Sequence, residues 1–507
     1  MRTLVDLLHG GAAAASAIRS VEGAPPLAYG ELRALAEQTI RDLNALGIGR
    51  GDRVAMVLPN GPTAASAFLC IAAGATAAPL SPGLTAEELE FNFGDLRAKA
   101  LLVAPGSAPE AREVAARLGL GIVELVPQAE RGAGSFSLDA LAPAAPGPCL
   151  PGPAGEDDVA LVLHTSGSTA QPKIVPLLQR NLCASARHIV AALGLGPEDV
   201  GLNLMPLFHI HGLMAGLLAP LSAGAQVACA PGFNGLKVFE WLDQVRPTWY
   251  TAVPTMHQAI LARAPRHRPQ IERARLRLVR SSSASLAPQV MQELEETFRC
   301  PVIEAYGMTE AAHQMASNPL PPLARKPGSV GLPAGPEMAV MDERGSILAQ
   351  GQVGEVVVRG PNLTPGYEAN PEANAAAFHG GWFRTGDQGV IGEDGYLRLT
   401  GRLKELINRG GEKIAPIEID VVLMDHPAVQ RCVTFAMPHD KLGEEVAAAV
   451  VLREGNSCTE RQLRDFAAGR LADHKVPRHF VFVRDLPQGR TGKLQRIGLA
   501  RKLGLIG

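Results

Sequence analysis

The chain has 507 residues, 46% of them apolar, which is sufficient for more than one folding unit with a large core. Its formal net charge of −2 gives no sign of the charged surface that nucleic acids or membrane surfaces recognise. No apolar run is long enough for a spanning helix or a signal peptide, and the seven cysteines form no C-x-x-C pair. We therefore expect a cytoplasmic protein with neither nucleic acid nor membrane as a partner.

Helical and strand patterns alternate along the first part of the chain. Residues 30–46 repeat apolar side chains at intervals of three and four, which predicts an amphipathic helix, and residues 62–75 predict a second helix. Short apolar runs typical of buried strands lie at 54–58, 78–80, 101–103, 159–163, 226–229 and 276–280. This alternation predicts an α/β fold, with helix-covered parallel sheets in a large N-terminal domain.

The pattern changes beyond about residue 325. Short strands such as residues 355–359 are separated by turns, and Asp394-Gly395 between two apolar pairs predicts a hairpin, so we expect a small β-rich subdomain. The elements predicted after Arg402 are a helix over 416–424, strands near 433–435 and 447–452, and a helix over 460–471. Together they predict an α+β domain of about 100 residues.

A loop rich in hydroxyl groups follows the predicted strand 159–163. Four hydroxyl residues and one glycine occupy positions 165–169, and Lys173 lies just beyond them. Hydroxyls, backbone N–H groups and a cation after a buried strand suit the binding of a polyphosphate. The loop is not a Walker A motif, because Pro172 precedes the lysine and Ile174 follows it.

Four further segments indicate which class of protein this sequence resembles. They are Tyr306-Gly307-Met308-Thr309-Glu310, Trp382-Phe383-Arg384-Thr385-Gly386-Asp387, Gly401-Arg402-Leu403-Lys404-Glu405 and Pro487-Gln488-Gly489-Arg490-Thr491-Gly492-Lys493. In this order and spacing, the loop and these segments resemble the acyl-adenylate-forming superfamily, and within it the acyl-CoA synthetases. The resemblance implies an N-terminal domain over residues 1–401 and a small mobile C-terminal domain over residues 402–507.

The resemblance also implies the reaction. A carboxylate attacks the α-phosphate of ATP with release of pyrophosphate, and the thiol of coenzyme A then displaces AMP from the mixed anhydride. Both steps build up negative charge, so cations, N–H donors and Mg²⁺ are needed. ATP, Mg²⁺ and coenzyme A are therefore expected to take part.

Residue roles follow from the resemblance, motif by motif. The implied nucleotide-binding residues are Thr165, Ser166, Gly167, Ser168, Thr169, Lys173, Ser283, Ala284, Glu304, Ala305, Tyr306, Gly307, Thr309, Asp387, Arg402 and Lys493. The implied catalytic residues are Lys493, Thr309, Glu310 and His209, with Glu310 as the Mg²⁺ ligand. Lys404 is the implied hinge, and the implied path of the thiol is lined by Gly410, Gly411 and Glu412. The phosphate loop departs from many relatives at Ala170 and Ile174, where these carry glycine.

The acid-binding pocket is implied by three segments in which serine and histidine dominate. The candidate substrate-binding residues are His209, Ser281, Ser282 and His313. A fatty or aromatic acid needs an apolar, roomy pocket, whereas these polar residues suit a small acid with a second anionic group. The segments resemble those of oxalate–CoA ligases, and we therefore expect oxalate as the preferred acid.

Several alternatives remain open at this stage. Malonate or a short monocarboxylate, such as acetate or formate, would change only the acid, and malonate is disfavoured because no arginine clearly faces the pocket. An adenylation enzyme that serves a carrier protein is a further alternative, although the chain shows no carrier domain. A regulatory nucleotide-binding protein would need neither Lys493 nor Glu310. A metal site at His209 and His211 lacks an evident third ligand.

Overall fold

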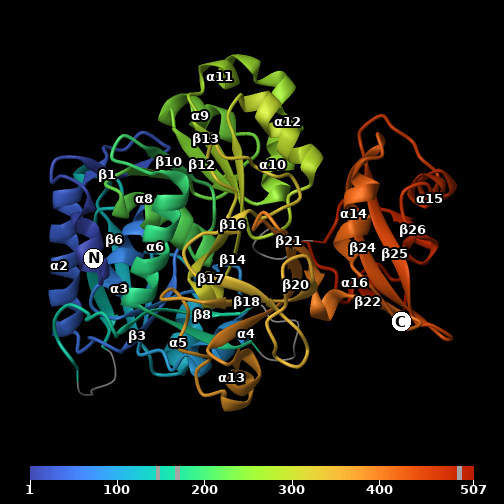
Figure 1. The fold of residues 1–507 in the computed structure, drawn as a ribbon. Helices are drawn as coiled ribbons and strands as arrows, with labels where there is room; N and C mark the ends of the chain where they lie inside the picture. Colours follow the sequence, from blue (N-terminus) through green and yellow to red (C-terminus); the bar gives the residue numbers. More distant parts are fainter. Residues whose placement is uncertain (144–148, 166–171, 488–493, 507) are drawn as a thin grey trace.

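Strands and helices alternate through the first two thirds of the protein, as the apolar pattern predicts. The computed structural model describes residues 1–143, 149–165, 172–487 and 494–506. This part of the chain forms two large, mainly parallel sheets, a small antiparallel sheet and a mixed C-terminal sheet. Figure 1 shows the C-terminal segment, in orange and red, beside the larger body. The predicted α/β fold is confirmed.

The first large sheet carries the base of the predicted phosphate loop. Its seven strands within the described residues follow the order β7 (Phe136–Ala142), β6 (Gly121–Pro127), β5 (Ala100–Val103), β3 (Arg53–Val57), β4 (Thr76–Pro79), β8 (Val159–His164) and β9 (Ile174–Leu178). The neighbours from β6 to β8 pair in parallel, whereas β8 and β9 pair as an antiparallel hairpin. The hairpin strands β8 and β9, which flank the predicted loop in the sequence, form one edge of the sheet.

The second large sheet carries the Tyr-Gly-Met-Thr-Glu segment. In the described residues it contains nine strands, in the order β16 (Leu332–Pro333), β15 (His313–Ser317), β14 (Val302–Met308), β13 (Leu278–Ser281), β12 (Trp249–Ala252), β10 (Val200–Asn203), β11 (Gln226–Cys229), β1 (Ser16–Ser20) and β2 (Leu27–Ala28). The strands from β14 to β1 pair in parallel, and β15 turns back antiparallel to β14.

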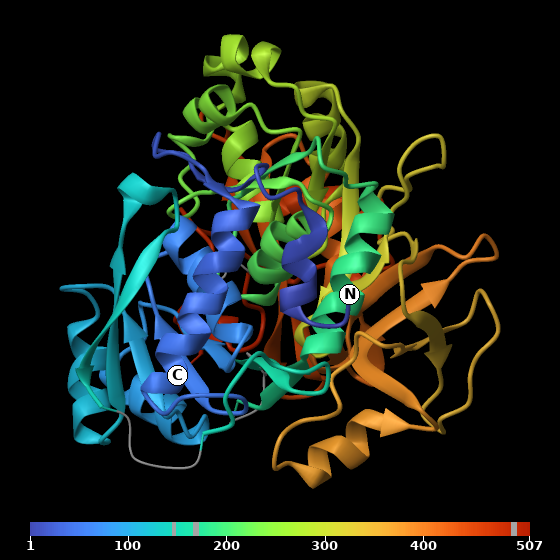
Figure 2. The same cartoon turned by 90° about the vertical axis from the view of Figure 1, so that its left-hand side faces the viewer.

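Two helices pack between the large sheets. Helix α3 (Pro62–Ala72) contacts β4 of the first sheet and β1 and β11 of the second, and α6 (Gln179–Leu193) contacts β8, β9 and β15. Every residue of α3 from Ala64 to Ala72 is buried, as expected for a helix that is apolar on all sides. Figure 2 shows the blue and green helices of the first half of the chain facing the viewer.

Shorter and peripheral helices complete this larger body. They are α1 (Leu4–Leu7), α2 (Tyr29–Ala45), α4 (Ala86–Asp95), α5 (Pro109–Arg117), α7 (Ile210–Leu213), α8 (Ala219–Ser222), α9 (Val238–Val245), α10 (Pro254–Leu261), α11 (Arg268–Arg273), α12 (Pro288–Phe298) and α13 (Pro371–Ala377). Helix α2 coincides within one residue with the helix predicted over 30–46.

A short segment of the chain connects the antiparallel sheet to the C-terminal sheet. The former contains β17 (Glu337–Met341), β18 (Val353–Arg359), β19 (Phe378–His379), β20 (Trp382–Ile391) and β21 (Leu397–Arg402). The latter contains β22 (Ile407–Arg409), β23 (Glu412–Ile414), β24 (Val429–His439), β25 (Gly443–Leu452) and β26 (His479–Phe482), with helices α14 (Pro416–Met424), α15 (Glu460–Ala468) and α16 (Leu499–Lys502). A 3₁₀ turn at Leu403–Glu405 joins β21 to the strand that follows.

The hairpin predicted at Asp394-Gly395 is confirmed, because Ile391 and Leu397 pair across it.

All seven cysteines are free thiols. Among the described residues, the search for a long apolar helix able to cross a membrane finds none.

Candidate active site

One hairpin of the second sheet carries residues from each predicted part of the site. Strand β14 contains Tyr306, a 3₁₀ turn at Thr309–Ala311 contains Glu310, and β15 begins at His313. A Cβ atom on Gly307 would lie 2.5 Å from the His313 carbonyl carbon, so only glycine lets the two strands approach this closely. Ala312 and His313 adopt positive φ angles of 44° and 87°, which is the kind of strained backbone found at functional sites.

Buried side chains of the main body fix this hairpin. Asn362 is fully buried, and its Nδ2 donates to the carbonyls of Ala311 and Gln314 at 2.7 and 2.9 Å. The hydroxyl of Ser185 donates to the Ala312 carbonyl. The turn that carries Glu310 is therefore held in place before any ligand binds.

The predicted nucleotide-binding residues Tyr306, Asp387 and Arg402 meet at strands β20 and β21 of the antiparallel sheet. The Tyr306 hydroxyl donates to Asp387 Oδ2 at 2.5 Å, and the Arg402 guanidinium lies 3.2 Å from Asp387 Oδ1. Asp387 and Arg402 are paired neighbours on β20 and β21, which accounts for their contact. The Asp387 side chain is 10% exposed and that of Arg402 is 57% exposed, so the pair reaches the surface from the arginine side. The carboxylate has two acceptor oxygens, as a vicinal diol requires.

Glu310 lies beside the base of the phosphate loop. Its carboxylate is buried and accepts a hydrogen bond of 2.8 Å from the Tyr367 hydroxyl, and Lys173 Nζ lies 4.4 Å from the centre of the Tyr367 ring. Burial raises the pKa of Glu310 above its ordinary value of 4.5, because it disfavours the anion. The backbone N–H of Thr165 donates to the Lys173 carbonyl at 2.9 Å and closes the loop.

These groups fit a bound Mg²⁺ with nucleotide phosphates. A hard cation prefers oxygen ligands, and it is usually held by one or two carboxylates together with substrate phosphates. Glu310 would supply the carboxylate, with the Thr309 hydroxyl and the Lys173 ammonium beside the phosphates. When bound, the cation neutralises phosphate charge as it accumulates. Because burial disfavours the anionic form of Glu310, a bound cation beside this carboxylate would stabilise the anion.

One predicted acid-binding residue, His313, contacts a buried arginine. Arg280 of β13 is fully buried and donates to His211 Nε2 at 3.2 Å, to His313 Nε2 at 3.1 Å and to Gln314 Oε1 at 3.1 Å. His211 Nδ1 lies 3.0 Å from the Ser283 hydroxyl. The sequence shows no arginine that clearly faces the pocket, and in the structure Arg280 contacts the predicted pocket residue His313.

The predicted serines and their neighbours support the loop beyond β13. Ser282 donates to the Ala305 carbonyl at 2.9 Å, and Ser281 is fully buried. Glu304 Oε1 accepts from the Leu286 N–H at 2.9 Å, whereas Glu304 Oε2 is buried and has no hydrogen-bond partner among the described residues. Burial raises the pKa of Glu304 to about 8. Ala284 is exposed on the same loop.

His209 lies at the N-terminus of α7, whereas His211 lies within this helix and contacts Arg280. The Nδ1 atom of His209 accepts from the backbone N–H of His211 at 3.3 Å as a helix cap. His211, which is not among the residues predicted for the acid site, is the histidine that contacts Ser283, Thr251 and Arg280. In the described residues, no group of three or more His, Cys, Asp or Glu side chains is arranged to hold a metal ion.

The remaining predicted residues lie in the C-terminal segment or outside the described residues. Lys404 is exposed in the 3₁₀ turn that leads to β22. Gly410 and Gly411 form the exposed two-residue turn of the β22–β23 hairpin, with φ angles of 62° and 99°, and Glu412 follows. Predicted residues outside the described part of the chain are Ser166, Gly167, Ser168, Thr169 and Lys493.

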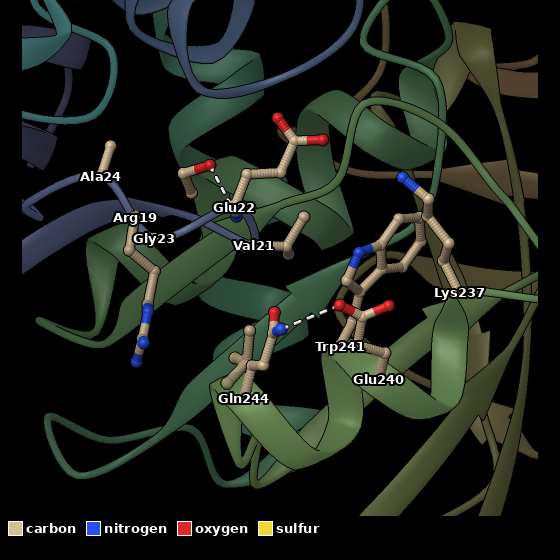
Figure 3. Close-up of a pocket in the computed structure, with 11 residues that line it drawn as sticks. Arg19, Val21, Glu22, Gly23, Ala24, Lys237, Glu240, Trp241 and Gln244 are labelled. Carbon is tan, nitrogen blue, oxygen red and sulfur yellow. Dashed lines mark hydrogen bonds between the residues drawn. The ribbon is translucent and has the colours of Figure 1, made fainter.

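A separate hollow lies on another face of the larger body. Figure 3 shows it between the loop after β1 and helix α9, with Arg19, Glu22, Lys237 and Trp241 in its lining. Its volume is about 470 Å³, and none of its lining residues is a predicted site residue. The hydrogen-bonded clusters around Glu310, Asp387 and Arg280 therefore define the candidate active site.

Comparison with known proteins identifies the class of this protein. The chain belongs to the AMP-binding enzyme family, whose profile matches residues 12–368, and the profile of the AMP-binding enzyme C-terminal domain matches residues 418–493. An oxalate–CoA ligase from Arabidopsis thaliana is 47% identical over 94% of this chain and 93% of its own length. An oxalate–CoA ligase from Saccharomyces cerevisiae is 40% identical over 88% of this chain and 86% of its own length. The crystal structure of ATP-bound MatB from Rhodopseudomonas palustris has a TM-score of 0.86 and 30% identity, over 97% of each chain. The predicted resemblance is confirmed.

Two contacts of the site escaped the sequence analysis. Arg280 ends a predicted buried strand, and an arginine at the end of such a strand, followed directly by serines, is a signal that the sequence contains. Tyr367 gave no comparable signal, because its contact with Glu310 joins residues 57 positions apart.

Proposed function

We propose that this protein is an oxalate–CoA ligase. The predicted ATP-dependent ligation of an acid to coenzyme A, with Mg²⁺, is confirmed at the level of the enzyme class by family membership and by relatives named as oxalate–CoA ligases. In the proposed reaction, one carboxylate oxygen of oxalate attacks the α-phosphorus of ATP and pyrophosphate leaves. The thiolate of coenzyme A then attacks the acyl carbon, and AMP leaves with that oxygen.

The buried charge of Arg280 carries the choice of acid. The guanidinium is fully buried, and no carboxylate of the described residues contacts it. A buried charge without a counter-ion is costly, and a second carboxylate on the substrate would supply the opposite charge. The Ser283 hydroxyl and the imidazoles of His211 and His313 form a polar surrounding for Arg280, which suits a second carboxylate better than the apolar chain of a fatty acid.

We propose the remaining roles from the resemblance, and the contacts among Tyr306, Asp387 and Arg402 support theirs. Asp387 and Arg402 bind the ribose, and Tyr306 lies against the adenine and orients Asp387 through its hydroxyl. Thr309 binds the α-phosphate and Glu310 binds Mg²⁺. The loop 165–169 with Lys173 binds the outer phosphates, and Lys493 bridges the reacting carboxylate and the α-phosphate.

The two-domain description is part of the same proposal. Residues 1–401 form the domain that binds nucleotide and acid, and residues 402–507 form a mobile domain that carries Lys493 and rotates about Lys404. Rotation would bring Gly410, Gly411 and Glu412 to the thiol path. A turn that joins two sheets can absorb such a change in backbone angles. We place the protein in the cytoplasm, with small molecules as partners and neither nucleic acid nor a membrane.

Malonate is the second candidate acid. It also has two carboxylates, and Arg280 removes the argument that counted against it. Its extra methylene lengthens the acid, so the two candidates differ in the distance between the carboxylates rather than in charge.

A product assay with a panel of acids tests the proposal. Purified protein with ATP, Mg²⁺ and coenzyme A would be offered oxalate, malonate, acetate, formate and benzoate, with AMP release and thioester mass as readouts. Oxalyl-CoA as the main product supports the proposal. Malonyl-CoA as the main product would replace oxalate by malonate, and turnover of monocarboxylates alone would overturn our interpretation of Arg280.

A further inference from the structure

The hydrogen-bond donors of Arg280 act on two histidines at once. Its Nη1 donates to His211 Nε2 at 3.2 Å, and its Nη2 donates to His313 Nε2 at 3.1 Å. The two imidazole rings stack, with centroids 4.8 Å apart and an interplanar angle of 20°. Both rings therefore present the same edge to one guanidinium.

A guanidinium has N–H donors and no acceptor. Burial lowers the pKa of Arg280 to about 9, so the group remains charged at neutral pH. Each Nε2 atom must then accept with its lone pair, and in the neutral imidazole the ring proton has to reside on Nδ1. Protonation of either ring would place a second cation against the first, which disfavours the imidazolium form.

The position of the proton on His211 sets the next hydrogen bond. His211 Nδ1–H must donate to the Ser283 oxygen, 3.0 Å away. The Ser283 hydroxyl then has its own proton for a further acceptor. Ser283 is half-buried and has a φ angle of 75°, a left-handed conformation that is uncommon for a non-glycine residue. With this tautomer, the Thr251 hydroxyl, 2.6 Å from His211 Nε2, must be the donor in their hydrogen bond.

We propose that Arg280 is a positioning residue for acid specificity, which fixes the Nδ1–H tautomers of His211 and His313 and so makes Ser283 and His313 hydrogen-bond donors toward a second carboxylate. This inference rests on the proposed function, because it assigns these donors to the acid subsite. The guanidinium acts through the two rings, and its own charge adds long-range attraction for the anion. An acid without a second carboxylate would not form the hydrogen bonds that Ser283 and His313 offer, and its affinity would be lower.

Nitrogen-15 NMR of histidine-labelled protein tests the tautomers without any substrate. Pyridine-like and pyrrole-like ring nitrogens have well-separated shifts, and His211→Gln and His313→Gln assign the signals. We expect pyridine-like Nε2 and pyrrole-like Nδ1 for both rings in the full-length wild-type chain near neutral pH. A protonated Nε2 on either ring would overturn the inference, whatever acid the enzyme uses.

Kinetics of Arg280→Lys and Arg280→Met provide the second readout. We expect KM for oxalate to rise at least about tenfold in Arg280→Met, with KM for ATP within about twofold and a mixture of tautomers in the spectrum. Arg280→Lys keeps a donor and a charge and should recover part of the affinity and the wild-type tautomers. If Arg280→Met does not fold, the lysine variant and the wild-type spectrum decide.

Arg277→Lys is the matched control, because Arg277 precedes the same strand but pairs with Asp199 instead of a histidine. Its kinetics and spectrum should match those of the wild type. Equal KM changes for oxalate and acetate in Arg280→Met would also contradict a role in specificity. Correct tautomers together with no turnover of oxalate would leave the network standing and reject only the proposed function.

Discussion

Replacing Gly307 by alanine tests how far one hairpin determines the geometry of the site. The added Cβ would lie 2.5 Å from the His313 carbonyl carbon, whereas ordinary contact begins near 3.4 Å. The strands β14 and β15 must therefore separate by more than about 0.9 Å, because the carbonyl oxygen lies nearer than this carbon and a backbone obstacle has no rotamer to change. Tyr306, Glu310 and His313 would be displaced relative to one another.

The expected cost has two parts. Overpacking of this kind destabilises a fold by about 1–3 kcal/mol. A misplacement of about 1 Å at a catalytic centre costs about 100-fold in rate. We therefore expect Gly307→Ala to fold with a lowered Tm and to lose about two orders of magnitude in kcat/KM for the acid, measured by AMP release.

Gly94→Ala in α4 is the control. No atom lies within 4 Å of the Cβ that it would add, and its backbone is helical. It should gain about 0.5–1 kcal/mol of stability and keep the wild-type activity. A Gly307→Ala enzyme with kcat/KM within about twofold of wild type would refute the view that the approach of these strands sets the site.

Three further predictions concern single groups. Tyr306→Phe removes a donor to a carboxylate and should raise KM for ATP about 10- to 100-fold, while Tyr396→Phe, which loses only an exposed bond to a carbonyl, should not. Glu310→Gln keeps an acceptor for its buried partner but removes the charge, so steady-state assays should show a large loss of kcat that added Mg²⁺ does not restore. The pKa of Glu304 is raised from 4.5 to about 8, so its proton stabilises the fold fully below about pH 4.5, and this contribution is lost as pH rises towards 8. Thermal unfolding of the ligand-free enzyme should show that Glu304→Gln weakens this decline, and an unchanged pH dependence of Tm would contradict the assignment.

Local elements were predictable from the sequence because their apolar periodicity depends on near neighbours. The helix predicted over 416–424 has those bounds in the structure, and the strand predicted over 226–229 is β11. The predicted strand 276–280 begins two residues late, at Leu278, and extends to Ser281. Boundaries such as this depend on pairing with β12 and β14, which the local pattern does not contain.

The site was predictable where motifs name their residues and unpredictable where partners come from distant segments. Asp387 and Arg402 were both assigned to the ribose, and their pairing across β20 and β21 follows from the hairpin. Arg277 and Arg280 look alike in the sequence, yet one binds Asp199 beside the sheet and the other is fully buried against two histidines. Only the packing of β13 between its neighbours separates the two arginines.

Transfer of oxygen-18 from oxalate to AMP tests the central claim most directly. The proposed attack of an oxalate oxygen on the α-phosphorus places that oxygen in AMP when coenzyme A displaces it. With uniformly labelled oxalate, we predict AMP with one heavy oxygen, together with oxalyl-CoA that has lost one label. Unlabelled AMP, or ADP and phosphate in place of AMP and pyrophosphate, would contradict the account.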